Sequence, residues 1–196
     1  LAMKSHQKCF YLIDGNKKLL PKFVTVSNIA SRDPEQVIKG NERVIRPRLA
    51  DARFFFETDR KSTLISKIEP LKNVVFQEKL GSIFDKSERV ATLSAYIASE
   101  LNIEPLHCKR AAMLSKCDLL TNMVAEFADL QGVMGSYYAK HDKETHEVVC
   151  ALREQYLPRF AGDDLPQSQT GTVLAIADRL DSIVGLFGVG QPPTGS

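Results

Sequence analysis

Five cationic side chains lie close together in the first third of the chain: Lys39, Arg43, Arg46, Arg48 and Arg53. Arginine suits phosphate because its planar guanidinium group donates two parallel hydrogen bonds and stays charged at any biological pH. A cluster of such residues is typical of a surface that contacts the backbone of a nucleic acid. The residue types therefore predict phosphate contacts at these five positions.

A helix is the element expected to position these side chains, because apolar residues recur at helical spacing within 40–59. Gly40-Asn41 indicates a turn into this helix, with Asn41 as its N-cap. Pro47 is then either tolerated early in the helix or marks its true start. Alternatively, the arginines only pair with acidic residues of the same segment, which are Glu42, Asp51, Glu57 and Asp59. Composition by itself favours this second interpretation.

The net charge of +2 is unevenly distributed along the 196 residues. Residues 1–62 contain 13 Lys and Arg against 7 Asp and Glu, whereas residues 63–196 contain 13 against 17. The basic part is therefore the better candidate for facing a polyanion. The acidic remainder does not read as a general nucleic-acid surface.

Cysteine usage and hydropathy point to a cytoplasmic protein. The four cysteines are scattered and form no CxxC pair, so neither a zinc finger nor a disulfide framework is predicted. The apolar runs are too short to cross a bilayer, and no targeting pattern opens the sequence. Because the chain starts abruptly at Leu1, we expect it to be a piece of a longer protein.

The pattern of elements predicts an α+β, mainly helical fold. Residues 8–13 and 19–26 read as strands of a β-hairpin, joined by a turn at Asp14–Lys17. We expect residues 1–62 to be the C-terminal part of a truncated α+β domain and 63–196 to be an all-helical domain. Helices are predicted in this second part at 87–101, 105–117, 119–127, 133–141, 144–156 and 168–187.

Residues 40–59, GNERVIRPRLADARFFFETD, resemble a block of the β subunit of bacterial glycyl-tRNA synthetase, the tetrameric kind with two α and two β subunits. Cys9 departs from the family's pattern, where an aromatic residue is expected. Further segments resemble the same family in the same order, and they are 6–10, 20–28, 75–82, 114–124, 127–135 and 156–166. The resemblance therefore covers nearly the whole chain.

This resemblance implies a share in joining glycine to its tRNA, with ATP and Mg bound by the α subunit. It implies that the β subunit binds tRNA(Gly) and is required for the assembled enzyme. We therefore expect no catalytic residue and no cofactor within these 196 residues. The α subunit and tRNA(Gly) are the expected partners, with α–β or β–β contacts in a tetramer.

The helical part also resembles the HD superfamily of metal-dependent phosphohydrolases, which hold a divalent metal with an early His, a His-Asp pair and a distant Asp. Lys86 stands at the position of the first His and Cys117 at that of the paired His, while Asp118 and Asp178 match. A protonated lysine repels a cation and cannot ligate it. We therefore expect an HD-like domain without metal, in which Lys86 pairs with Asp118 or Asp178.

Two alternatives from other functional classes remain open. One is an active HD-type, metal-dependent phosphohydrolase, and the other is a purely architectural module that contacts only protein. The literal dipeptide His141-Asp142 is a weak metal signal, because His141 and His146 lie five residues apart and do not share a helical face. Solvent-facing histidines, with Asp142 or Thr145 capping the next helix, are the simpler interpretation.

Overall fold

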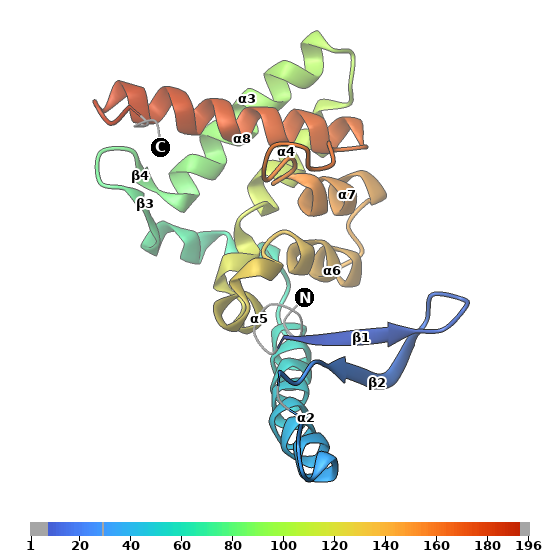
Figure 1. The fold of residues 1–196 in the computed structure, drawn as a ribbon. Coiled ribbons are helices and arrows are strands. Elements are labelled where there is room, and N and C mark those ends of the chain that lie inside the picture. Colours follow the sequence, from blue (N-terminus) through green and yellow to red (C-terminus); the bar gives the residue numbers. More distant parts are fainter. Residues whose placement is uncertain (1–7, 29, 193–196) are drawn as a thin grey trace. The chain divides into compact units, whose positions relative to one another are not determined.

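The computed structural model describes residues 8–28 and 30–192, and the fold is α+β and mainly helical, as predicted (Figure 1). The chain divides into a first unit that ends at Thr58 and a second that begins at Asp59. This division falls near the boundary placed after residue 62 from the sequence. Each unit is described below by itself.

The first unit opens with the predicted β-hairpin. Strand β1 (Cys9–Ile13) pairs antiparallel with β2 (Leu19–Thr25), so that Cys9 lies opposite Thr25. In the turn, the Asp14 backbone N–H donates to the Lys18 carbonyl at 2.9 Å. The Asp14 side chain accepts from the backbone N–H groups of Asn16 and Lys18, which closes the turn as an Asx turn does.

Helix α2 (Pro34–Asp59) follows, and it begins earlier than the sequence predicted. Asp33 accepts a hydrogen bond from the Gln36 backbone N–H at 3.2 Å, and Pro34 takes the first helical position. The predicted start with Asn41 as N-cap is wrong, because the Asn41 side-chain amide instead donates to the Val37 carbonyl one turn back. The Asp-Pro start provides the cap, so the helix continues through the Gly-Asn pair.

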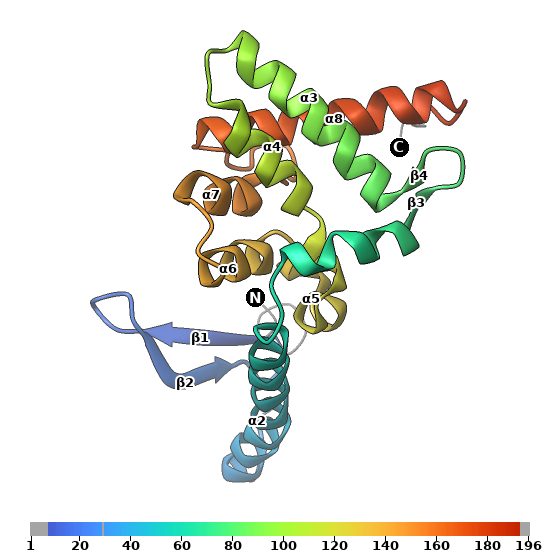
Figure 2. The ribbon, with the colours of Figure 1, turned by 180° about the vertical axis from the view of Figure 1, so that it is seen from behind.

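The second unit is built mainly from helices, and Figure 2 shows their arrangement from behind. Its α-helices are α3 (Ile83–Glu100), α4 (Pro105–Leu114), α5 (Asn122–Glu126), α6 (Val133–His141), α7 (His146–Glu154) and α8 (Gln169–Gly188). Its 3-10 helices are η1 (Ile65–Lys67), η2 (Glu69–Asn73), η3 (Cys117–Leu120) and η4 (Ala128–Leu130). Among the described residues, no helix is long and apolar enough to span a membrane.

Strands β3 (Val75–Gln77) and β4 (Gly81–Ser82) form a small hairpin that the sequence did not predict. They are too short to show an alternating pattern. The hairpin leads into α3, where Ser82 and Asp85 form a capping box. The helix therefore starts at Ile83, before the predicted position of residue 87.

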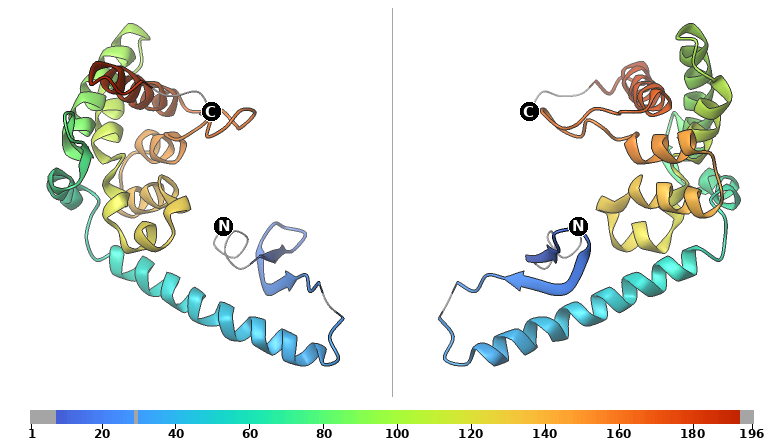
Figure 3. Two further views of the ribbon diagram at one scale, coloured as in Figure 1. Left: turned by 60° about the vertical axis from the view of Figure 1, so that its left-hand side comes forward. Right: turned by 90° about the vertical axis from the view of Figure 1, so that its right-hand side faces the viewer.

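Helix α8 packs against α3, α4 and α7, and the side views in Figure 3 show these four helices together. Fully buried leucines fill the unit, among them Leu64, Leu71, Leu114, Leu152 and Leu174. Burying each such side chain stabilises the fold by about 1.5–3 kcal/mol. The packing of α8 against α3 is what brings the buried charges described below together.

Asp59, the first residue of the second unit, is a buried carboxylate with several donors. It accepts hydrogen bonds from the backbone N–H groups of Asn122 and Met123, from the Asn122 side chain and from the Tyr138 hydroxyl. These bonds satisfy N–H groups at the start of α5. Asp59 is therefore a structural residue of the helical unit.

Candidate functional site

The predicted phosphate-binding residues all lie on α2 and are all exposed. An α-helix turns by roughly 100° per residue, so Lys39, Arg43, Arg46 and Arg53 fall within one narrow face. Arg48 falls on the opposite side. The buried Ile45 and the half-buried Ala52 also lie away from the basic face. We call the surface made by Lys39, Arg43, Arg46 and Arg53 the basic face of α2.

The two ends of the basic face are neutralised by acidic neighbours. Lys39 lies 3.6 Å from Glu35, and the Arg53 guanidinium donates to Glu57 at 2.8 Å. The second pair is one that the acidic-pairing interpretation predicted. Both pairs are highly exposed, so each contributes little to stability. Lys39 and Arg53 can therefore leave their acidic partners and bind a phosphate at little cost in free energy.

Arg43 and Arg46 differ from the residues at the ends. Neither makes an ion pair or hydrogen bond with another side chain in the parts of the chain that the structure describes. Two guanidinium groups one turn apart therefore face solvent with all their donors available. This is the feature of α2 that the acidic-pairing interpretation does not explain.

The second candidate site is the set of positions that resemble a damaged HD metal centre. Lys86 is buried, and its ammonium group is surrounded by oxygen atoms. It lies 3.1 Å from one Asp178 carboxylate oxygen and donates to the Asp178 carbonyl, the Asp181 carboxylate and the Ser182 hydroxyl at 3.2, 3.2 and 2.7 Å. The predicted pairing of Lys86 with Asp178 is thus confirmed, and it ties α3 to α8.

Lys116 is a second buried cation at this place, and sequence reasoning missed it. Its ammonium group donates to the other Asp178 oxygen at 3.1 Å, to the Gln155 amide oxygen at 3.0 Å and to the Tyr156 hydroxyl at 3.3 Å. Burial by itself raises the pKa of Asp178, but Lys116 and Lys86 together hold it below its usual range. The carboxylate is therefore ionised between two ammonium groups.

Asp181 and Arg89 complete what we call the buried ion cluster, which consists of Lys86, Arg89, Lys116, Asp178 and Asp181, with Arg89 half-exposed at its edge. The Arg89 guanidinium donates to both Asp181 oxygens, at 2.7 and 3.3 Å, and to the Leu80 carbonyl at 3.0 Å. A signal for these partners was present in the sequence. Lys86 and Arg89 are spaced i, i+3 on α3, and Asp178 and Asp181 are spaced i, i+3 on α8.

Asp118 and Cys117, the remaining HD-like positions, have separate environments. Asp118, the other predicted partner of Lys86, instead accepts hydrogen bonds from the backbone N–H groups of Gly132 and Gly135, at 2.6 and 3.0 Å. Burial raises the pKa of Asp118 despite these bonds. Burial also raises the pKa of the Cys117 thiol to about 12, so this cysteine is a structural residue rather than a nucleophile.

The residues at these positions do not fit a divalent metal. The Asp178 carboxylate, which would be a ligand, is already bracketed by the ammonium groups of Lys86 and Lys116. Within residues 8–28 and 30–192, no group of three or more His, Cys, Asp or Glu side chains is placed to hold a metal ion. This donor set gives no support to the phosphohydrolase alternative.

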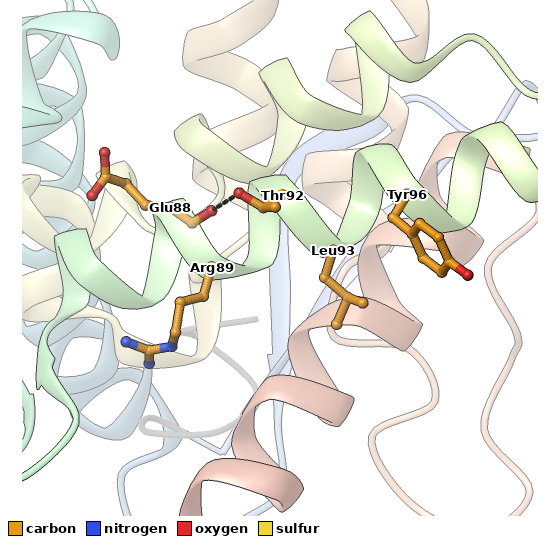
Figure 4. A pocket seen from close by; sticks show the side chains of 5 residues that line it. All are labelled: Glu88, Arg89, Thr92, Leu93 and Tyr96. Atoms are coloured by element: carbon orange, nitrogen blue, oxygen red, sulfur yellow. Dashed lines mark hydrogen bonds between the residues drawn. The ribbon is translucent and has the colours of Figure 1, made fainter.

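A surface hollow lies along α3, lined by Glu88, Arg89, Thr92, Leu93 and Tyr96 (Figure 4). Its one cationic side chain, Arg89, is already bound to Asp181, and Glu88 brings a negative charge. The Thr92 hydroxyl donates to the Glu88 carbonyl within the helix. The hollow therefore lacks convergent donors for an anion.

His141 and His146 are both exposed, as the simpler interpretation predicted. Asp142 accepts a hydrogen bond from the Leu64 backbone N–H at 2.7 Å and so holds the segment before η1. Thr145 is the N-cap residue of α7 but makes no side-chain capping bond. Thr145, one of the two residues expected to cap α7, is thus its N-cap residue, but the side chain does not complete the cap.

Comparison with known proteins decides the family. All residues, 1–196, match the family model described as glycyl-tRNA synthetase beta subunit. The chain belongs to this family. Residues 40–59 and the other ordered segments predicted membership of this family, and the match confirms that prediction.

Curated relatives agree with the family match. The glycine–tRNA ligase beta subunit of Marinobacter nauticus is 60% identical over 195 residues, and those of Chromohalobacter salexigens and Vibrio parahaemolyticus are 56% identical over 195 residues. Each comparison covers 100% of this chain but only 28% of the relative. The chain therefore spans less than a third of the length of these glycyl-tRNA synthetase relatives.

Proposed function

We propose that this chain is part of a glycine–tRNA ligase β subunit and supports glycyl-tRNA formation by binding the tRNA(Gly) backbone through the basic face of α2. The observation that carries the proposal is the pair Arg43 and Arg46. Both guanidinium groups are exposed and have no protein partner among the described residues, and they lie between Lys39 and Arg53 on the basic face of α2. Family membership supplies the substrate class, since the relatives are named as glycine–tRNA ligase subunits.

The geometry suits phosphate contacts along one strand. Lys39 and Arg53 are fourteen residues apart in α2, which corresponds to roughly 21 Å along the helix axis. A row of cations of this length can contact several successive phosphates and release their counterions. Arg48 lies off this face, so we exclude it from the contact set.

In this proposal the chain itself performs no aminoacylation step. The α subunit binds ATP and Mg and catalyses glycine transfer, in the cytoplasm, and the β subunit joins it in a tetramer. The buried ion cluster then serves only to hold the helical unit together. The domain would be HD-like in fold while lacking the donor set for hydrolysis.

The test replaces Arg43 and Arg46 with Ala in the complete enzyme and measures the tRNA(Gly) dissociation constant over a range of salt concentrations. Each lost phosphate contact lowers the slope of log K against log salt by roughly 0.7–0.9. We therefore expect weaker binding at low salt and a slope smaller by about 1.4–1.8. Arg48→Ala is the matched control, because it removes one exposed arginine from the opposite side of the same helix.

Equal binding by the double variant and the parent enzyme at every salt concentration would overturn the assignment to α2. Retained binding of the α subunit together with no tRNA effect would favour the architectural alternative. A larger effect from Arg48→Ala than from the double variant would place the contact on the other side of α2.

A further inference from the structure

An aromatic side chain lies beside the basic face of α2 and has no place in the packing. Phe54 is 63% exposed, although phenylalanine is among the residues most often buried. It follows Arg43 by eleven residues and Arg46 by eight, which places it at the edge of the same face. The phosphate contacts proposed above make no use of this ring.

The Phe54 ring is held by its neighbour rather than by the protein core. Its centroid lies 6.0 Å from that of Phe55, with 61° between the ring planes, so the two rings meet edge to face. Phe55 is half-buried, and it therefore supports Phe54 from the side. This arrangement leaves Phe54 accessible next to the guanidinium-bearing Arg53.

We propose that Phe54 is a stacking platform for an unpaired nucleobase of the RNA whose phosphates the basic face contacts. The inference rests on the proposed function and deepens it, because it names the kind of RNA segment that binds. An exposed aromatic ring beside arginines is the combination by which proteins bind single-stranded nucleic acid. Bases inside an A-form duplex offer no free face, since both faces are stacked. The site therefore takes an unpaired nucleotide, such as one in a loop, a bulge or an end.

The chain provides a sharp test, because it contains no tryptophan. Phe54→Trp introduces a single tryptophan, which keeps the ability to stack and whose indole is excited at longer wavelengths than the five tyrosines. The indole emission of this variant is followed while a single-stranded oligoribonucleotide, or a duplex of the same sequence, is added to the 196-residue chain. Phe187→Trp is the matched control, because Phe187 is 57% exposed on α8, whose last turn has no basic residue.

We expect the single strand to quench the emission of the Phe54→Trp variant, the duplex to quench it much less, and neither to quench the Phe187→Trp variant. In the same titrations Phe54→Leu, which keeps an apolar side chain but loses the ring, should weaken single-strand binding by about 5- to 100-fold. Duplex binding should change little. Because Phe54 is exposed, neither substitution at this position is expected to unfold the helix.

The outcomes separate this inference from the proposed function. If Phe54→Leu binds the single strand as well as the parent does, while Arg43→Ala with Arg46→Ala weakens it, stacking is wrong and the phosphate contacts stand. If the Phe54→Trp variant is quenched but the arginine double variant binds normally, the stacking site stands and the phosphate assignment fails. Equal quenching of the two tryptophan variants would show non-specific contact and overturn the inference.

Discussion

The basic face of α2 and the buried ion cluster use the same residue types in opposite ways. On α2, the side chains of Lys39 and Arg53 are 76% and 80% exposed, and each touches one acid that is itself in solvent. In the cluster, the side chains of Lys86 and Lys116 are 5% and 8% exposed, and the two share one carboxylate, that of Asp178. Solvent access, rather than residue type, separates the two regions.

This difference determines what each region can do. An exposed cation keeps its hydration and costs the fold almost nothing, so it remains available to an external anion. A buried cation has lost its hydration and must be compensated by fixed partners, which leaves none of its donors for a ligand. The cluster is therefore structural, while the basic face is suited to recognition. The predictions below test this division by its effects on stability.

The largest effect is expected from Asp178→Asn. The substitution keeps the size of the side chain but removes the charge that Lys86 and Lys116 share. Breaking a buried pair by removing one partner typically costs about 3–5 kcal/mol, because it leaves an uncompensated buried charge. We expect the free energy of unfolding, measured by urea denaturation, to fall by about that amount.

Asp129→Asn is the control for this experiment, because Asp129 is exposed and the same change in charge should alter stability by less than about 0.5 kcal/mol. A fall of under about 1 kcal/mol for Asp178→Asn would mean that water reaches the lysines. The comparison between a buried and an exposed region would then fail.

A smaller effect is expected from pH, and its sign follows from the pKa of Asp178. A carboxyl group with a lowered folded-state pKa contributes stability that is complete above its ordinary value of 3.8 and is lost as pH falls through the lowered value. The difference in unfolding free energy between the parent and Asp178→Asn should therefore shrink as pH falls below 3.8. The raised pKa of Asp118 affects the pH dependence of stability in the opposite direction. Asp118 is present in both proteins, so its contribution cancels in this difference.

Urea denaturation of both proteins, repeated at intervals from about pH 6 to about pH 2.5, measures this difference. A difference that stays constant down to the lowest pH would show that Asp178 does not titrate with the cluster. A difference that shrinks already near neutral pH would show that its pKa is raised rather than lowered. Either outcome would contradict the proposed arrangement of two lysines around an ionised carboxylate.

Much of the fold was predictable because it depends on local signals. The hairpin follows from two β-branched and aromatic runs around Asp14, and the helix ends follow largely from caps and spacing. The start of α2 was misplaced because Gly40 and Asn41 were interpreted as the end of a turn. Both residues destabilise a helix only modestly, so other interactions can carry the helix through them. Here the capped start at Asp33 and the packing of Ile45 outweigh a cost of about 1 kcal/mol at the glycine.

The candidate sites were predictable only in part, because they depend on which faces meet. The sequence identified the cations of α2 but left open whether the helix runs unbroken through Pro47, and the opposite placement of Arg48 follows from the helical spacing only once it does. The sequence identified Lys86 and Asp178 through the resemblance to the HD superfamily. The role of Lys116 could be found only from the structure, because it depends on α8 placing Asp178 beside it. The HD likeness of the helical unit itself stays a prediction.

The smallest effect is expected from substitutions on the basic face itself. Arg43→Ala with Arg46→Ala removes two charges that have no protein partner among the described residues, and Ala is the best helix former. The free energy of unfolding should therefore change by no more than about 0.5 kcal/mol in either direction. Thermal unfolding of the chain, run beside the tRNA titrations, measures this change.

The stability of this double variant also decides how its tRNA binding is interpreted. A loss of about 2 kcal/mol, which is typical of residues that hold a fold together, would mean that weakened tRNA binding reports unfolding instead of recognition. Stability that is unchanged while the salt slope falls assigns the two guanidinium groups to tRNA binding, because the fold then does not depend on them and the salt slope reports phosphate contacts.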